Sequence, residues 1–354
     1  MTVSESTKVA LPVAAKAQRV FLRGIGKATG PFYGALRRIG PTNAAGDRLD
    51  PFMAAAAFAA STIPSLDMHD DDPVAARRKM DGAAAMMAPV FPSFSVDEDL
   101  VIDGSDGPIP ATRYRAGGVS RGVVVYFHGG GWTIGSRASH DSTARALAVN
   151  AGVDVLSIDY RLAPENPFPA AAEDALAAWR YAVEHAGSWG LDPAKIGVAG
   201  DSAGGNLAAV VAQQTKGDDI VPAHQLLIYP AVDLAGQTES MSEFATGRFL
   251  TREHMDWFID NYLPDPADRE KPLASPLRAD DLSGLPPAHV VVAGFDPLRD
   301  EGLAYAAKLG EAGVPVTLDR AGAMIHGFFN MSALSPAARD SVQRAARAVA
   351  DALG

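Results

Sequence analysis

The sequence predicts an α/β fold in which an eight-stranded, mostly parallel sheet is flanked by helices. Beyond residue 122, short apolar runs alternate with longer helical stretches, which is the pattern of strand–helix–strand units in a parallel sheet. The chain has 354 residues, of which 47% are hydrophobic, so it can bury a large core. Length and composition therefore fit one large domain with a smaller appended segment.

Eight apolar or β-branched runs predict the strands. They lie near Leu100–Ile102, Pro110–Arg115, Val123–Phe127, Val153–Ile158, Ile196–Ala199, Leu226–Tyr229, Val290–Ala293 and Val316–Leu318. The first two runs have no helical stretch between them, so we expect them to form an antiparallel edge of the sheet.

Five stretches predict the helices that cover this sheet. They are Ser139–Asn150, Ala170–His185, Ala203–Thr215, Glu301–Ala312 and a final helix at Ala337–Leu353. Because helices of this length follow most of the later strands, they are expected on both faces of the sheet.

Charge and cysteine content exclude several classes of function. With 31 basic and 42 acidic residues, the net charge is −11, which argues against a nucleic-acid partner. The absence of cysteine rules out disulfides and leaves few ligands for zinc, so no metal site is expected. No apolar run approaches the roughly 20 residues of a membrane-spanning helix. Residues 1–20 also lack a signal-peptide layout, so we expect a cytoplasmic protein without a transmembrane segment. A homodimer is compatible with the sequence.

Residues 1–50 differ in charge from the rest of the chain, because basic side chains outnumber acidic ones there. One interpretation is an amphipathic segment that contacts an anionic membrane surface. The other is a lid or packing segment that meets the acidic body of the protein. Gly24, Gly26, Gly30 and Pro31 interrupt any helix, which favours the packing interpretation.

A candidate nucleophile stands between the fifth predicted strand and the helix that follows it. The string GDSAG at residues 200–204 places Ser202 at the apex of a tight turn. Small flanking residues allow the two backbones to approach, and the serine is expected in a strained conformation that exposes its hydroxyl. The N-terminus of the following helix favours developing negative charge near this hydroxyl.

Three glycines follow the third predicted strand, in the string HGGGW at residues 128–132. Their bare N–H groups suit an oxyanion hole, which binds the negatively charged carbonyl oxygen of a reacting acyl group. A flexible turn or a phosphate-binding loop is the alternative, but the chain lacks the glycine–lysine and glycine-repeat patterns of phosphate loops here. His128 is expected to brace this loop.

An acid and a base are needed to activate a serine, and both have candidates. Asp296 follows the seventh predicted strand directly, where open α/β folds keep functional groups. Asp300 and Glu301 compete for the role but look like first-turn acids of the next helix. Among eight histidines only His326 lies after the last strand, in a loop. The order Ser202, Asp296, His326 is that of α/β-hydrolases.

Five motifs together resemble the bacterial hormone-sensitive-lipase family of esterases. They are HGGG at 128–131, DYRLAPE at 159–165, GDSAG at 200–204, DPLRD at 296–300 and HGF at 326–328. The resemblance covers about residues 95–350. It is closer to the branch with aspartate before the serine than to the branch with threonine.

This resemblance implies an α/β-hydrolase fold, no cofactor and hydrolysis of carboxylic esters with short or medium acyl chains. Carried over by motif position, Ser202 is the nucleophile, Asp296 the acid and His326 the base. The oxyanion donors are the backbone N–H groups of Gly130, Gly131 and Ala203. Asp159 and Glu165 look structural and are expected to hold the floor of the active site.

The resemblance also implies a helical cap over the serine. Residues 232–280 are polar and dotted with aromatic side chains, as in the family's cap insertion. We therefore expect residues 1–95 to form an N-terminal extension and the first part of the cap, and residues 232–280 to form the second part. Residues 96–231 and 281–354 form the two parts of the catalytic core.

Two other functions stay open at this level. The same groups could hydrolyse an amide or small peptide, although an amine is a poorer leaving group and needs more acid assistance. A non-catalytic receptor for a small ligand could use the same scaffold, because fold does not by itself imply function. The presence of Ser202, Asp296 and His326 together argues against the receptor.

Overall fold

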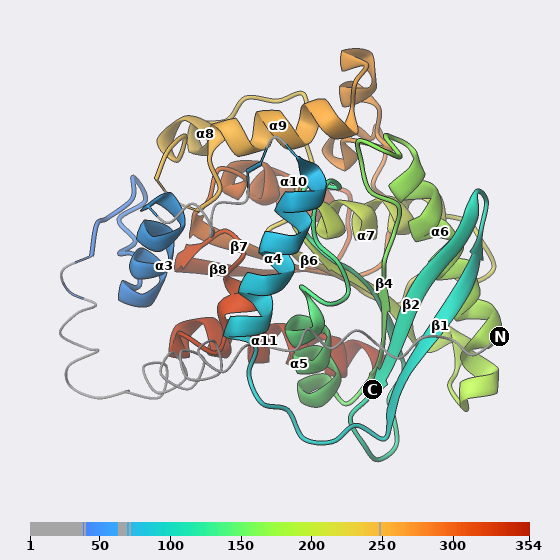
Figure 1. Ribbon diagram of the computed structural model, residues 1–354. Coiled ribbons are helices and arrows are strands. Elements are labelled where there is room, and N and C mark those ends of the chain that lie inside the picture. The colour runs from blue at the N-terminus through green and yellow to red at the C-terminus, as the bar shows by residue number, and fades with distance from the viewer. Residues whose placement is uncertain (1–37, 39, 63–68, 71, 248) are drawn as a thin grey trace.

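The eight predicted strands form one sheet in a computed structural model, in the order β1-β2-β4-β3-β5-β6-β7-β8 (Figure 1). The structure describes residues 38, 40–62, 69, 70, 72–247 and 249–354. The strands are β1 (Val96–Gly104), β2 (Gly107–Arg115), β3 (Val123–Phe127), β4 (Asp154–Ile158), β5 (Ile196–Asp201), β6 (Gln225–Ile228), β7 (Ala288–Phe295) and β8 (Val316–Ile325). β2 pairs antiparallel with both β1 and β4, and the other pairs are parallel. The expected antiparallel edge is confirmed.

The core lies on both faces of the sheet, because the central strands are buried on both sides. Along β3, Val123, Val125 and Phe127 belong to one apolar cluster, whereas Val124 and Tyr126 belong to the other. The first cluster contains side chains of α6 (Ala170–His185), α7 (Ala203–Gln214) and α10 (Arg299–Glu311). The second contains those of α5 (Asp141–Ala151) and α11 (Pro336–Leu353). Such continuous apolar strands are typical of parallel sheets covered by helices.

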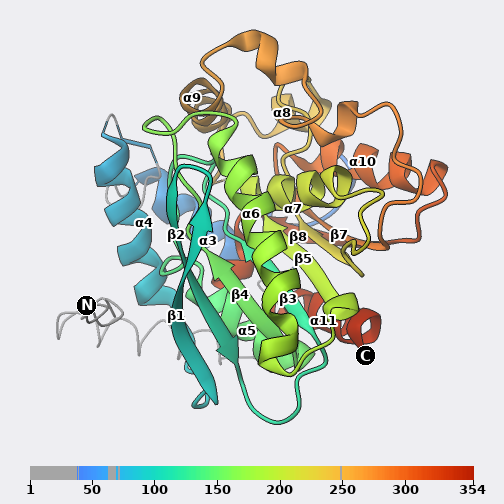
Figure 2. The ribbon, with the colours of Figure 1, turned by 90° about the vertical axis from the view of Figure 1, so that its right-hand side faces the viewer.

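Further helices lie beyond the sheet, near the carboxyl ends of its parallel strands. Figures 1 and 2 both show α8 (Glu239–Glu243) and α9 (Arg252–Tyr262) at the top of the molecule. Helix α4 (Pro73–Met87) runs down the face turned to the viewer in Figure 1 and down the left side in Figure 2. α3 (Pro51–Thr62) packs beside the second apolar cluster through Met53 and Ala57. We call α3, α4 and α9 the covering helices. Short 3-10 turns complete the connections, at Ala186–Trp189, Pro193–Lys195, Pro266–Glu270, Pro276–Arg278 and Phe328–Met331.

The last strand is longer than the sequence predicts. β8 continues from Leu318 to Ile325, although Asp319 and Arg320 interrupt its apolar run in the middle. Asp319 pairs with Arg344 of α11 at 3.0 Å and accepts a hydrogen bond from Ser341, so its charge is partnered outside the sheet. Because β8 is an edge strand, polar residues are tolerated on it and the apolar pattern fades.

The start of the chain is only partly described. The expected membrane-facing or packing segment at residues 1–50 lies mostly outside the described residues. Within the described part, Asn43 donates a hydrogen bond to Gly294 O (2.9 Å) and Ala44 N–H donates to Glu243 (2.7 Å), so this stretch lies against the end of β7. None of the described helices combines the length and apolar character needed to cross a bilayer.

Candidate active site

Ser202 stands at the tight turn between β5 and α7 in a strained backbone conformation. Its φ is 56° and its ψ is −119°, a region that non-glycine residues rarely adopt. The flanking glycines are required by close approach. A Cβ atom at Gly204 would lie 1.9 Å from Phe127 O, and one at Gly200 would lie 2.2 Å from Gly204 C. The turn therefore has the geometry that the GDSAG string predicts.

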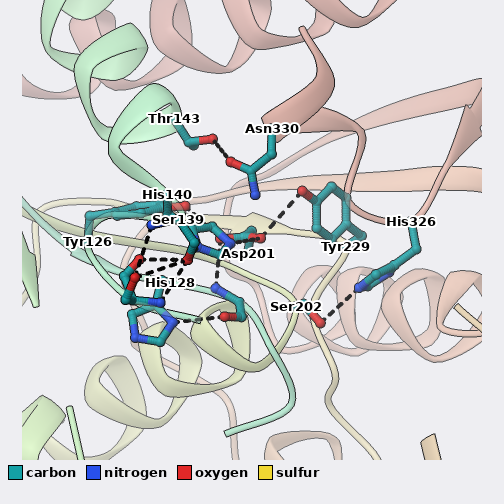
Figure 3. A network of polar contacts seen from close by, with 12 residues as sticks. Tyr126, His128, Ser139, His140, Thr143, Asp201, Ser202, Tyr229, His326 and Asn330 are labelled. Atoms are coloured by element: carbon teal, nitrogen blue, oxygen red, sulfur yellow. Dashed lines mark hydrogen bonds and ion pairs between the residues drawn. The ribbon is translucent and has the colours of Figure 1, made fainter. Parts of the chain in front are cut away.

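The structure brings the three predicted triad residues together. His326 Nε2 lies 2.9 Å from Ser202 Oγ (Figure 3). The other ring nitrogen, Nδ1, lies 2.7 Å from Asp296 Oδ2. Asp296 is fully buried, and its other oxygen accepts the Leu298 N–H at 2.9 Å. Both partners leave the carboxyl ends of neighbouring strands, Asp296 after β7 and His326 after β8. This geometry allows the imidazole to take a proton from the serine while the carboxylate orients it.

The glycine loop presents unpaired N–H groups to the same place. Gly130 has φ of 120° and Gly131 has φ of 57°, conformations that favour glycine. A Cβ at Gly131 would also lie 2.1 Å from Phe258 Cγ. Gly130, Gly131 and Ala203 line a cavity together with Ser202 and His326. Within the described part of the chain, the N–H groups of these three residues have no hydrogen-bond acceptor.

The two competing acids have other partners. Asp300 accepts the Ser240 N–H at 2.7 Å and pairs with the neighbouring Arg299. Glu301 is buried and accepts the Val232 N–H at 2.7 Å, and burial raises its pKa to about 8. They lie in the first turn of α10, as expected, and both carboxylates accept N–H groups of the chain that follows β6. Asp296 is the acid that reaches His326.

His128 braces the glycine loop, as the sequence predicts. Its ring stacks on Tyr160 at 4.3 Å, and the Tyr160 hydroxyl donates a hydrogen bond to His128 O at 2.7 Å. Burial lowers the pKa of His128 to about 4, so the ring is neutral at pH 7. The contacts of His128 are therefore structural.

Asp201 and His140 form a buried network that sequence reasoning missed. Asp201 accepts hydrogen bonds from the Tyr126 hydroxyl (2.6 Å) and the Gly129 N–H (3.0 Å), and His140 Nε2 lies 3.4 Å from its other oxygen (Figure 3). Burial acts to raise the pKa of Asp201, but His140 and Tyr126 outweigh it and hold that pKa below the ordinary value. The only sequence signal was the aspartate inside GDSAG, and nothing in the sequence linked His140 to it.

The segment at residues 159–165 makes ion pairs with two neighbouring segments through its two acidic side chains. Asp159 accepts hydrogen bonds from the backbone and guanidinium of Arg137, at 2.6 and 2.8 Å. Glu165 receives both terminal nitrogens of Arg77, at 2.8 and 2.6 Å. Arg77 belongs to α4, so Glu165 attaches a covering helix and does not only support the floor.

The cavity in front of Ser202 has a volume of about 390 Å³ and mostly apolar walls. The covering helices and the chain after His326 supply these walls, including Phe52, Ala56, Met80, Ala84, Met87, Met255, Phe258, Met331 and Leu334. His69 lies edge-on to Trp257 of α9, with ring centres 5.2 Å apart. Among the described residues, no group of three or more His, Asp or Glu side chains is placed to hold a metal ion. An apolar pocket beside a few polar groups is the usual form of a small-molecule site.

Comparisons with known proteins agree with this geometry. A family model described as the alpha/beta hydrolase fold matches residues 124–330. The carboxylic ester hydrolase LipN of Mycobacterium tuberculosis (strain ATCC 25618 / H37Rv) is 48% identical over 271 residues, which cover 74% of this chain and 72% of LipN. The ethyl acetate hydrolase of Pseudomonas putida is 37% identical over 276 residues, covering 76% of this chain and 87% of that enzyme.

A solved structure is similar over most of the chain. The hyperthermophilic esterase from the archaeon Pyrobaculum calidifontis has a TM-score of 0.81 and 38% identity, covering 86% of this chain and 99% of that one. The chain belongs to the α/β-hydrolase family, among the hormone-sensitive-lipase-like esterases.

Proposed function

We propose that this protein is a serine carboxylesterase that hydrolyses short- to medium-chain acyl esters. The observation that carries the proposal is the continuous chain of contacts from Ser202 Oγ through His326 to the buried Asp296. The relatives named as carboxylic ester hydrolase and ethyl acetate hydrolase support the choice of an ester as substrate.

In the proposed mechanism, Ser202 Oγ attacks the ester carbonyl carbon while His326 Nε2 takes the serine proton. Asp296 keeps the His326 ring in the required tautomer and stabilises its positive charge. The carbonyl oxygen becomes an anion held by the N–H groups of Gly130, Gly131 and Ala203, each such donor being worth roughly 10²–10³ in rate. His326 then gives its proton to the leaving alcohol, and water repeats the sequence on the acyl-enzyme.

We also propose that the covering helices act as a cap over the acyl group. In this assignment residues 1–95 and 232–280 form the cap, and residues 96–231 and 281–354 form the catalytic core. The apolar side chains of α3, α4 and α9 around the cavity support it, because an acyl chain is bound by apolar area. A covered site also limits water around the charged transition state.

The test of the proposed function is hydrolysis of p-nitrophenyl esters from acetate to palmitate by the wild type and by Ser202→Ala. We expect turnover that is highest for short or medium chains and lost in the variant, by about 10³-fold or more. Matched p-nitroanilides measure the preference for ester over amide. Equal rates in both proteins, or no turnover in either, would contradict the proposal and favour a non-catalytic ligand-binding role.

Three further inferences from the sequence concern location, assembly and membrane contact. A cytoplasmic location and a homodimer stay predictions, and contact of residues 1–50 with a membrane surface stays the less favoured alternative to a packing segment. The last of these concerns a segment mostly outside the described residues.

A further inference from the structure

We propose that Asp201 is a positioning residue that aligns the two halves of the oxyanion hole, with His140 holding its carboxylate in place. This inference rests on the proposed esterase function and assigns a role to a side chain that does not touch the ester. It starts from the fact that the predicted oxyanion donors come from two separate segments, the glycine loop and the start of α7.

Asp201 connects these two segments directly. In the chain it precedes Ser202, whose next neighbour Ala203 carries one donor. Its side chain accepts the N–H of Gly129 at 3.0 Å, and Gly129 precedes the two donors of the glycine loop. A Cβ atom at Gly129 would lie 2.6 Å from Asp201 Oδ2, so the loop backbone and the carboxylate are in close contact. A shift of the carboxylate would therefore move one half of the hole relative to the other.

The carboxylate itself is held by groups from several elements. Oδ1 accepts the hydroxyl of Tyr126 on β3 at 2.6 Å, and Oδ2 accepts the hydroxyl of Tyr229, which follows β6, at 3.5 Å. His140 Nε2 approaches Oδ2 to 3.4 Å. The side chain of Asp201 is 3% exposed and that of His140 is 1% exposed. A hydrogen-bonded carboxylate in such surroundings has little freedom to rotate.

The contact made by Nδ1 of His140 explains why the other ring nitrogen, Nε2, points at Asp201. His140 Nδ1 lies 2.9 Å from Ser139 Oγ, which also accepts the Ser136 N–H at 2.8 Å (Figure 3). Because Ser139 engages Nδ1, Nε2 faces the carboxylate of Asp201. Both His140 and Asp201 also border the cavity of Ser202. A bare carboxylate at this place would oppose the developing oxyanion, so the hydrogen-bond donors around the Asp201 carboxylate reduce that repulsion.

Asp201→Asn tests the proposal with almost no change in volume. The asparagine oxygen can still accept from Tyr126 and Gly129, but its NH₂ group then faces Nε2 of His140, which serves as a donor to the native carboxylate. We expect kcat to fall by about 10- to 100-fold, because misalignment weakens a donor worth roughly 10²–10³. KM should stay within about threefold, since a contact made mainly in the transition state affects kcat and not ground-state binding.

A transition-state analogue separates this role from a merely structural one. In a trifluoromethyl ketone adduct, Ser202 Oγ bonds to the carbonyl carbon, its proton passes to His326, and the former carbonyl oxygen becomes an oxyanion. We expect the affinity of Asp201→Asn for the ketone to fall by the same factor as kcat/KM. Rates are expressed per active site titrated with a fluorophosphonate, so that loss of folded protein does not count as loss of kcat.

Asp154→Asn is the matched control. Asp154 is also a fully buried carboxylate with cationic partners, Arg115 at 2.6 Å and Arg113 at 3.5 Å, but it begins β4 at the opposite end of the strands. This variant should lower the melting temperature and leave kcat per titrated site unchanged. If Asp201→Asn does not fold, Tyr126→Phe removes one donor to the carboxylate and should cause a smaller, parallel fall in kcat and in ketone affinity.

The outcomes separate the two proposals. An active wild type with unchanged kcat per site and unchanged ketone affinity in Asp201→Asn would overturn the inference alone. If Tyr126→Phe has to replace Asp201→Asn, unchanged kcat per site and unchanged ketone affinity in Tyr126→Phe would also overturn the inference. A wild type that hydrolyses no ester would overturn both the proposed function and this inference.

Discussion

The residue types at the site meet the demands of an unusual backbone conformation as well as those of the chemistry. Ser202 has a positive φ that costs on the order of 1–3 kcal/mol, so the surrounding contacts must hold it. Its N–H donates to Ile228 O at 2.9 Å, and its carbonyl accepts from Asn206 and Ala231. These bonds attach the turn to β6 and α7, which explains why a strained residue is stable here.

Gly131→Ala should abolish most activity because the new methyl group has no room. Its Cβ would lie 2.1 Å from Phe258 Cγ, so either the ring or the donor loop must move. We expect kcat/KM for p-nitrophenyl butyrate to fall by about 10²-fold or more. Gly217→Ala is the control, since Gly217 also has a positive φ, of 93°, but no atom within 4 Å of the added Cβ. A variant at Gly131 with normal kcat/KM would show that this loop conformation is not needed.

Glu301 should make stability depend on pH. Burial raises its folded pKa to about 8, above the value of about 4.3 in an unfolded chain, so the folded state binds more protons between these values. The stability that Glu301 contributes is therefore present below about pH 4 and is lost as the pH rises toward 8.

Glu301→Gln removes this titration but keeps an oxygen that can accept from Val232. We expect the melting temperature of the variant, relative to wild type, to rise between pH 5 and pH 9 by on the order of 2 °C. Thermal unfolding in buffers across this range measures it. A difference between the two proteins that does not change with pH would contradict the raised pKa.

At the scale of elements, Arg77 attaches the start of α4 to the core through four hydrogen bonds. Besides its two bonds to Glu165, Arg77 donates from Nε to Thr133 O and from Nη2 to Ala163 O, both at 2.8 Å. Thr133 itself bonds back to Gly130 O, so the covering helix and the glycine loop share a support. The position of the apolar wall on α4 thus depends on contacts made at the start of that helix.

Arg77→Gln should therefore weaken binding of longer acyl chains more than of acetate. Met80 and Met87, on the same helix, line the cavity and lose their fixed position when the tether is lost. We expect KM for p-nitrophenyl hexanoate to rise about tenfold, from a loss of on the order of 1.4 kcal/mol of contact. Arg78→Gln provides the control, because Arg78 is 70% exposed and approaches Asp72 only to 3.9 Å. Equal changes for both esters would mean that Arg77 acts on the whole fold.

At the scale of the whole molecule, we expect the substrate range to depend on the cavity, which no single segment forms. Its walls come from α3, α4, α9, the glycine loop and the chain after β8. Many of the wall residues on α3 and α4 are alanines, whose small side chains leave the space open. Each methylene buried there is worth about 0.8 kcal/mol, up to the point at which the cavity is full.

Ala84→Phe should shorten the preferred acyl chain by filling this space. We expect the ratio of kcat/KM for hexanoate to that for acetate to fall by about tenfold or more, since two or more methylenes lose their place. Ala85→Phe changes the same helix at a residue that does not border the cavity, and it should leave the ratio unchanged. An unaltered ratio in Ala84→Phe would place the acyl group elsewhere.

Much of the fold could be predicted because its signals are local. β3 and α6 begin and end where their sequence patterns do, since a buried strand is a continuous apolar run and a helix shows its own spacing. The length of β8 was underestimated, because this edge strand carries polar residues whose partners lie on α11. The covering helix α3 was reached only through the family resemblance, since its alanine-rich sequence has no clear apolar face.

The sequence by itself determined the kinds of groups at the site and their order along the chain. Four signals each follow the end of a strand: the Gly-Asp-Ser-Ala-Gly string, the three glycines, the aspartate and the histidine. Such a local signal encodes the backbone geometry of a few residues. Only the tertiary structure decided which groups meet. Ser202 and His326 are 124 residues apart in the chain, Arg77 and Glu165 are 88 apart, and Asp201 joins Gly129 across 72. Such contacts depend on how strands and helices pack, which no local pattern records.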